Sequence, residues 1–305
     1  MVKLAKPNIA KELIQLQAMN KLLKQAFTLI ELLVVIAIIG ILSGLIVISM
    51  GGVTEKATIA KAQVFSNSLR NSLMLDLIAE YKLDGNANDT WGNHTVGTIS
   101  GAATYSSCVQ NSCYSFDGAD DYIELADSAD LRMTIGGTIS AWIYPETLGE
   151  QSWGAIMDKS SAAGGLNGYA FVLTSSNRVY FTINNGVALI SSSDVVTLNQ
   201  WQLVTVTFNG SGRKIYINGV DKTATGGAQT ILPPDVAGVA RIGNRAYTTD
   251  ITFDGYIDEV RIYDAVVPTS QIQEQYYLGL NKLFTNGGIT EKEYLSRLNN
   301  YASNN

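Results

Sequence analysis

The first strong pattern along the chain is a continuous apolar segment, residues 27–50, with a single charged residue, Glu31. A helix of about 20 apolar residues crosses the hydrocarbon core of a bilayer, and a carboxylate inside it costs several kcal/mol unless it is paired. A proteolytic cut before Phe27 would create an α-amine close to Glu31, and the two groups could neutralise each other between neighbouring subunits. The pattern therefore predicts a membrane-spanning helix with an ionisable pair near its start.

Residues 53–82 follow Gly51 and Gly52 and carry a helical period. Their apolar positions are three and four residues apart, at Ile59, Ala62, Phe65, Leu69, Leu73 and Leu77. This spacing predicts an amphipathic helix whose apolar face packs against the next domain. Together with the apolar segment it would form one long N-terminal helix over residues 27–82.

From Asp84 onward the period changes to two, and Gly, Asn and Ser separate short alternating segments. The predicted strands are residues 121–125, 138–145, 169–174, 178–183, 202–208, 214–219 and 257–264. No helical stretch lies between them, so they predict an all-β antiparallel sandwich.

Residues 268–305 return to a helical pattern. Pro268 precedes the first helix, Gly287 breaks it, and Thr290 with Glu293 forms a capping box at the start of the second. We expect a short C-terminal helical hairpin that packs on the rest of the protein, with a contact to a neighbouring subunit or partner as the alternative.

Charge divides the chain into two parts. Residues 1–26 contain five lysines and one glutamate, a net charge of +4, which places them on the cytoplasmic side of a membrane. Without them the formal charge of −6 becomes −10. An acidic exported domain repels phosphates, so we expect no direct binding to nucleic acid.

Two cysteines, Cys108 and Cys113, lie in SSCVQNSCYS. In an exported domain they predict a disulfide, because two thiols without further ligands make a poor metal site. The one histidine, His94, lies in a polar segment and is interpreted as a surface residue.

The string FTLIELLV from Phe27 to Val34, with Lys24 upstream, resembles the class III signal of type IV pilins and pseudopilins. The resemblance implies that prepilin peptidase cuts between Ala26 and Phe27 and methylates the new amine, and that Glu31 guides docking into a filament. The family usually has Gly where this chain has Ala26, so slower cleavage is expected. An uncleaved signal anchor is the alternative.

The same resemblance implies partners and location. The partners are prepilin peptidase, a pilus assembly ATPase, a membrane platform protein and other copies of the chain in a helical filament. The precursor would be a single-pass protein of the cytoplasmic membrane with its N-terminus inside. The mature subunit would lie on the extracellular filament.

A second resemblance covers about 180 residues. It is carried by LDGNAND at 83–89, YSFDG at 114–118, TISAW at 138–142, IYING at 215–219 and GYIDEVRIY at 255–263. These segments resemble laminin-G-like, concanavalin-type jelly rolls. The domains expected are a leader over 1–26, a pilin-type helix over 27–82, a jelly roll over 83–267 and a helical hairpin over 268–305.

Two acidic motifs are candidates for metal binding. In laminin-G-like domains the first and last strands tend to be neighbours, so the resemblance implies that the loops at FDGADD and FDGYIDE meet. Asp117, Asp121, Asp254 and Asp258 would then offer the hard oxygen ligands that Ca²⁺ prefers. Everyday Asp-Gly turns are the alternative, and no cofactor is expected to be required.

Aromatic residues are candidates for sugar stacking. Trp142 and Trp201 lie within strand patterns and are expected in the core. Trp91 and Trp153 lie near turns and are the candidates for glycan contact, with burial under a loop as the alternative.

Catalysis is not expected. The Glu-x-Asp-x-Glu arrangement of the related glucanases is absent, and Asp258 and Glu259 are adjacent, so on a regular strand they point to opposite faces. We therefore interpret the chain as a structural subunit of a pilus-like filament whose head serves adhesion or glycan binding. The alternatives are a membrane-anchored carbohydrate-binding or glycan-processing protein, and a pseudopilin of a secretion or DNA-uptake system.

Overall fold

The computed structural model describes residues 76–302, apart from 93, 162–166 and 185–187. The chain separates into two compact units, residues 1–65 and 66–305, and every described residue belongs to the second. The expected leader and the expected helix up to residue 75 therefore lie outside the described residues. Among the helices that are described, none has the length and apolar character needed to cross a membrane.

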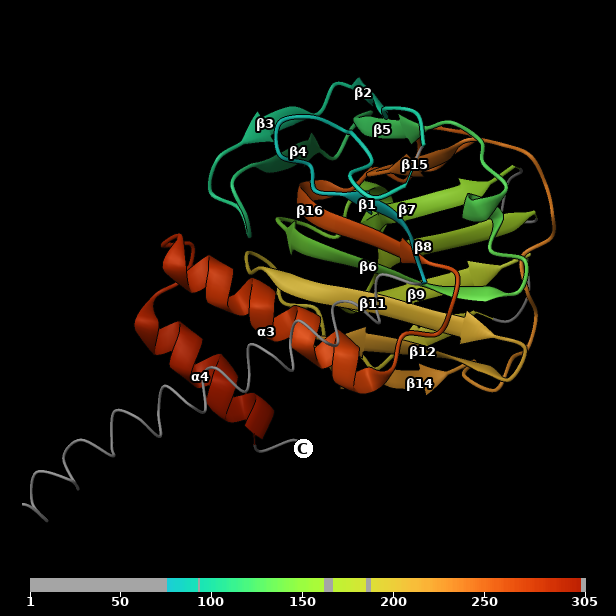
Figure 1. Cartoon of the computed structure of the whole chain (residues 1–305). Helices are drawn as coiled ribbons and strands as arrows, with labels where there is room; N and C mark the ends of the chain where they lie inside the picture. Colours follow the sequence, from blue (N-terminus) through green and yellow to red (C-terminus); the bar gives the residue numbers. More distant parts are fainter. Residues whose placement is uncertain (1–75, 93, 162–166, 185–187, 303–305) are drawn as a thin grey trace, which may run out of the picture. The chain divides into compact units, whose positions relative to one another are not determined.

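Two antiparallel sheets form the body of this unit (Figure 1). Sheet A contains β1 (Leu77–Tyr81), β3 (Ala103–Tyr105), β4 (Cys113–Asp117), β6 (Gly136–Pro145), β11 (Gln202–Asn209), β12 (Gly212–Ile217), β13 (Val220–Asp221) and β16 (Asp254–Tyr263). Sheet B contains β2 (Thr98–Ser100), β5 (Tyr122–Leu125), β7 (Trp153–Ser160), β8 (Gly168–Thr174), β9 (Arg178–Ile183), β10 (Leu189–Ser191), β14 (Thr223–Thr225) and β15 (Ala240–Ile242). Two 3₁₀ turns, η1 (Asp130–Arg132) and η2 (Glu150–Ser152), lie in the connections.

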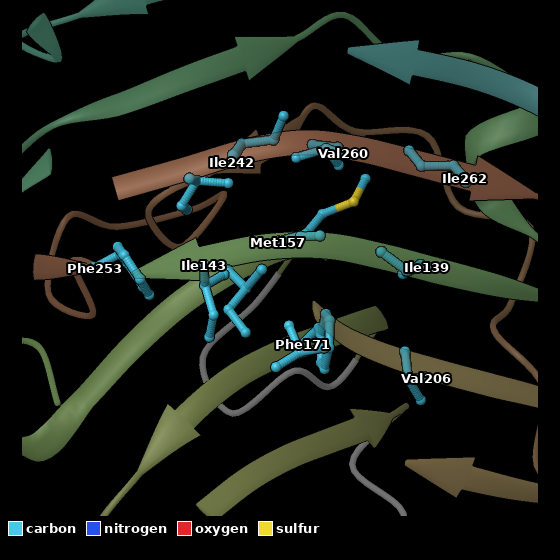
Figure 2. Packing of buried hydrophobic residues seen from close by; sticks show 14 of the residues in the cluster. Ile139, Ile143, Met157, Phe171, Val206, Ile242, Phe253, Val260 and Ile262 are labelled. Carbon is cyan, nitrogen blue, oxygen red and sulfur yellow. The ribbon is translucent and has the colours of Figure 1, made fainter. Parts of the chain in front are cut away.

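The main core lies between the two sheets. Figure 2 shows side chains of sheet A, such as Ile143 and Val206, facing Met157 and Phe171 of sheet B. All four are fully buried. Each strand contributes alternate residues to this layer, as expected for a sandwich in which side chains point to opposite faces in turn. The predicted sandwich is therefore confirmed.

Every strand predicted from alternation is present with small shifts at its ends. Residues 178–183 coincide with β9, and residues 202–208 lie within β11. Asn209 of the Asn209-Gly210 pair is the last residue of β11, and the Asn218-Gly219 pair follows β12, where Asn218 adopts a positive φ of 53°. These turns confirm that Asn-Gly dipeptides mark strand ends in this chain.

The predicted helix over residues 27–82 is wrong at its C-terminal end, because residues 77–81 form strand β1. Ala79 and Tyr81 face the core, and Glu80 faces outward. β1 pairs with β16 in the register Glu80↔Arg261 and Tyr81↔Val260. The helical spacing of apolar residues ends at Leu77, so it does not determine the conformation of the residues that follow. Pairing with β16 made this segment a strand.

The predicted C-terminal hairpin is present as α3 (Thr269–Thr285) and α4 (Glu291–Ala302). The Thr290 hydroxyl accepts a hydrogen bond from the amide of Glu293 at 3.3 Å, as expected of the cap. Figure 1 shows α3 along the outer side of sheet A, beside β6 and β11. The expected packing role is therefore confirmed.

Beneath the hairpin lies a second hydrophobic cluster on the outer face of sheet A. Trp142 stacks on Tyr276 of α3 with ring centroids 5.8 Å apart, and Trp201 belongs to the same cluster. Both tryptophans are buried, as predicted, but under helices and not between the sheets. A Cβ at Gly279 would lie 2.2 Å from the Trp142 indole, so glycine is what lets α3 approach this closely.

The disulfide between Cys108 and Cys113 is present, with Cα atoms 5.7 Å apart. Both cysteines are buried in the cluster beneath the hairpin, next to Ile289 of the α3–α4 connection. The crosslink closes a loop of five residues in sequence separation, which predicts a stabilisation of about 2 kcal/mol through the unfolded chain. Side-chain hydrogen bonds from Lys282 to Gln110 and from Asn286 to the Val109 carbonyl hold the 108–113 loop against the end of α3.

Candidate functional site

An open groove of about 300 Å³ lies on the outer face of sheet B. Its floor is made by Ala170 and Val172 of β8, two small side chains that leave the sheet surface low. Trp153 of β7 and Tyr180 of β9 rise on either side of β8, with ring centroids 5.3 Å apart in an edge-to-face arrangement. The groove therefore offers a broad aromatic wall that remains partly exposed.

The segment from Asn244 to Thr252, between β15 and β16, forms the opposite wall. The Ile251 carbonyl accepts a hydrogen bond from the Ala155 amide at 3.0 Å, which attaches the segment to β7. Arg245 and Asp250 line the groove and form an ion pair at 3.4 Å. Paired charges of this kind present both donors and acceptors to a ligand without adding net charge.

Asp158 of β7 lines the groove beside Ala170 and is 1% exposed. Its Oδ1 atom accepts hydrogen bonds from the amides of Ser160 at 2.8 Å and Ala246 at 3.2 Å. Burial raises the pKa of this carboxyl, although these hydrogen bonds oppose the shift. Asp158 thus fixes the loop that carries Arg245 onto the sheet and is a positioning residue.

The sequence pointed to Trp153 but not to its neighbours. Tyr180 alternates with Val179 and Phe181, which are buried in the core, so its outward direction could have been read from the strand pattern. No local signal marks Arg245, because a loop residue joins the site only through the attachment of its loop to β7.

The acidic motifs meet as expected. In the register of β4 and β16, Asp117 lies opposite Asp254. The carboxylates of Asp117, Asp120 and Asp121 offer oxygen atoms within 4.8 Å of one another, so Asp120 joins the candidates. Burial raises the pKa of Asp121, and the neighbouring carboxylates add to the shift. These three residues could hold a cation such as Ca²⁺. Asp254 is not part of this group, and its Oδ2 atom accepts a hydrogen bond from the Thr147 hydroxyl at 2.6 Å.

Asp258 does not belong to this cluster, so its assignment as a calcium ligand is wrong. Its Oδ2 atom accepts a hydrogen bond from the amide of Gln110, in the disulfide loop, at 3.1 Å. It is fully buried on the outer face of sheet A. Four residues along a strand separate it from Asp254, too far for both to bind one ion.

The inference that Asp258 and Glu259 point to opposite faces is also wrong. A β-bulge interrupts the pairing of β16 with β6 between Asp258 and Arg261, and Glu259 has a left-handed φ of 51°. The extra residue turns both acids to the outer face, while Ile257 and Val260 remain in the core. Adjacent acids on a bulged strand therefore lie side by side.

Trp91 does not line the groove on sheet B. It is 41% exposed and lines a cavity beside α3, on the side of sheet A.

The expectation that His94 is a surface residue is wrong. Its Nδ1 atom lies 2.6 Å from Oδ2 of Asp89, and its side chain is 11% exposed. The pair organises the turn after β1, since Asp89 also accepts the amide of Glu80.

A family model described as the concanavalin A-like lectin/glucanases superfamily matches residues 117–273, just over half of the chain. The chain belongs to this superfamily. A second model, the prokaryotic N-terminal methylation motif, matches residues 22–47. The chain therefore combines that motif with a concanavalin-like domain. The search of curated proteins gave no match.

Solved structures share the sandwich fold. Domain 4 of an extracellular arabinanase from Geobacillus stearothermophilus, solved with arabinotriose, is 21% identical with a TM-score of 0.50, covering 65% of this chain and 97% of that one. The binding domain of botulinum neurotoxin serotype D is 16% identical with a TM-score of 0.51, covering 67% and 52%. Trypanosoma rangeli sialidase is 12% identical with a TM-score of 0.53, covering 69% and 34%. At these identities the likeness establishes the fold alone.

Calcium at the acidic cluster stays a prediction. If Asp117, Asp120 and Asp121 bind Ca²⁺, stability should rise by about 2.7 kcal/mol at a concentration 100 times the Kd. Thermal denaturation with calcium and with EDTA measures this. Asp121→Asn retains an acceptor for the Asp117 amide and should abolish the calcium effect, whereas Asp235→Asn at an exposed site should retain it. Identical curves with calcium and EDTA would refute the prediction.

The buried acid at 258 predicts a pH dependence. Burial, with the neighbouring charge of Glu259, holds the pKa of Asp258 well above its usual range. Between the ordinary and the raised pKa the unfolded chain releases a proton that the native protein retains, so stability falls as pH rises. Asp258→Asn keeps an acceptor for the Gln110 amide and should flatten this fall, with about 1.4 kcal/mol recovered per unit of pKa difference.

Urea denaturation from pH 4 to pH 8 checks this expectation. Asp235→Asn removes an exposed carboxylate of the same type and controls for net charge. Parallel pH profiles for the wild type and Asp258→Asn would contradict the assignment.

Proposed function

We propose that the chain is a type IV pilin-like subunit that is assembled from the membrane into a surface filament. The observation that carries the proposal is Glu31, an acid near the start of an apolar segment that lies within the matched methylation motif, residues 22–47. An unpaired carboxylate in a span is costly. The cost is removed when a neighbouring subunit supplies the amine of a processed Phe27.

Assembly would follow from this pairing. The basic leader keeps residues 1–26 in the cytoplasm, and prepilin peptidase cleaves after Ala26. The amine of Phe27 then neutralises Glu31 of a neighbouring subunit as the apolar helices bundle. An assembly ATPase and a membrane platform protein supply the work of extraction, and the sandwich covers the filament surface.

We infer that the sandwich is a glycan-binding head and not an enzyme. The groove on sheet B supports this inference, because Trp153 and Tyr180 offer ring faces and edges while Arg245 and Asp250 offer paired hydrogen-bonding groups. Ligand sites of this kind combine an apolar wall with a few placed polar groups. The acids of the groove are already engaged, Asp158 with backbone amides and Asp250 with Arg245. They would orient a sugar and not cleave it.

A membrane-anchored carbohydrate-binding protein is the second candidate, and it shares the groove but not the processing. A pseudopilin of a secretion or DNA-uptake system would share the processing but not the exposed filament. Cleavage before Phe27 distinguishes a pilin-like subunit from the anchored protein, which keeps its leader. The presence of the mature chain in surface filaments distinguishes the pilin-like subunit from a pseudopilin.

The assembly proposal predicts a mature chain that begins with N-methylated Phe27 in sheared surface filaments. The intact mass of the protein recovered from this fraction measures it. Glu31→Val should leave the mature chain in membranes, because the amine then has no partner, whereas Glu31→Asp should retain partial assembly. A chain that keeps Met1 and never leaves the membrane would refute the pilin-like role and favour the anchored protein.

The glycan proposal predicts that Trp153→Ala weakens binding to sugars on a glycan array at least tenfold. The loss of one aromatic wall removes stacking area without disturbing the core, since Trp153 is partly exposed at the start of β7. Ile135→Ala is the control, because it truncates an exposed apolar side chain that lines neither this groove nor the cavity beside α3. Equal binding by both variants would show that the groove is not the glycan site.

A further inference from the structure

A separate cavity of about 330 Å³ lies on the outer face of sheet A, between α3 and the paired strands β1 and β16. Its volume is at the lower end of the range of about 300–1,000 Å³ found for small-molecule sites. The walls include Leu77 of β1, Tyr263 of β16 and Leu278 of α3. The groove near Trp153 belongs to the other sheet, so the two sites are independent.

The bulge in β16 places an unsatisfied acceptor on the wall of this cavity. Glu259 is 2% exposed, and its Oε1 atom accepts no hydrogen bond from the described part of the chain. The nearest printed cation, Nζ of Lys282, lies 3.8 Å from Oε1. Glu259 also has a left-handed φ of 51°, and non-glycine residues in this conformation concentrate at ligand sites. The cavity therefore presents a buried carboxylate oxygen that can accept a hydrogen bond from a ligand.

The charges around the cavity sum to a small positive excess. Arg261 lies between two acids, bonded to Glu80 at 2.9 Å and to Glu259. Lys82 and Lys282 line the same cavity. Two carboxylates against three cations leave one net positive charge, which favours a ligand that carries one negative charge.

Two side chains at the mouth complete the site. Trp91 is 41% exposed and presents a ring to solvent at the edge of the cavity. Lys82 has a side chain that is 38% exposed and lies 3.8 Å from Glu80, an exposed pair that is worth little in stability. An aromatic face beside an ammonium group is suited to a ring that is apolar on one side and anionic at its edge.

We propose that this cavity binds a sugar acid, a hydroxylated six-membered ring with one carboxylate. A ring hydroxyl donates to Oε1 of Glu259, the carboxylate lies at Lys82, and the apolar face of the ring stacks on Trp91. Each element of the ligand meets one feature of the wall: an acceptor without a hydrogen bond, an exposed ammonium group or an exposed ring. The cavity holds one ring, so the site takes a free sugar acid or the end of a chain of them.

Titration calorimetry of the purified full-length protein with D-galacturonate and D-galactose tests the proposal. Galacturonate should bind saturably, galactose at least tenfold more weakly, and the preference should shrink as salt screens the charges. Lys82→Gln should weaken galacturonate binding about tenfold, Lys82→Arg should retain it, and Trp91→Ala should weaken it at least fivefold. Both positions are exposed, so these variants keep the fold.

Trp153→Ala is the control that separates this site from the groove, and it should leave galacturonate affinity within twofold. The methyl glycoside of galacturonate distinguishes the two sources: equal affinity indicates a chain end, and binding of the free acid alone indicates a free sugar acid. No saturable binding, equal affinity for galactose, or a loss with Trp153→Ala and not with Lys82→Gln would overturn the proposal.

Discussion

One edge of β16 has to satisfy two different strands, and the rest of the head depends on that constraint. Its first half pairs with β4, and its second half pairs with β1. The bulge at Asp258 and Glu259 separates the two halves. A regular strand would continue one ladder along its whole length, whereas the bulge bends the strand and re-aims its side chains. The first described strand of the chain and the last strand of the sandwich are thereby joined in one sheet.

Several features of the molecule follow from this junction. The pairing with β4 places Asp254 opposite Asp117 and so brings the two acidic motifs together. The bulge turns Asp258 toward the disulfide loop and Glu259 toward the cavity under α3. The pairing with β1 places Glu80 opposite Arg261, which bridges this half-buried acid and the buried Glu259 on the cavity wall. Buried charges need such partners, because the free-energy cost of removing a charge from water is offset only by attraction to an opposite charge and by hydrogen bonds.

The two outer faces of the sandwich differ in how they are covered. On sheet A the hairpin buries Trp142 and its neighbours, and the glycine at 279 lets α3 lie close enough to do so. On sheet B no helix of the described part of the chain covers the equivalent surface, and Trp153 and Tyr180 remain partly exposed beside the 244–252 loop. The C-terminal helices thus leave one flat sheet face available to ligands and confine access on the other to a small cavity.

The sequence alone was sufficient for features carried by contiguous residues. The apolar segment with Glu31, the alternating strands, the Asn-Gly turns, the Thr290 cap and the Cys108–Cys113 pair depend on neighbours a few residues apart, so local periodicity records them. Trp153 could be predicted as a candidate for glycan contact because it lies next to turn residues, at the start of a strand. The alternation along β9 would also have predicted that the Tyr180 side chain points outward.

Only the tertiary structure decided the features that depend on distant partners. Residues 77–81 became a strand because β16, about 180 residues later, supplied the pairing edge. Asp258 and Glu259 share a face because a bulge interrupts the pairing of β16 with β6 at this point, and no local sequence pattern encodes that bulge. Arg245 and Asp158 met because a loop attached itself across β7. Sequence periodicity shows which side of an element is apolar, whereas register and bulges follow from which segments pair, and that choice is made by the assembled sheet.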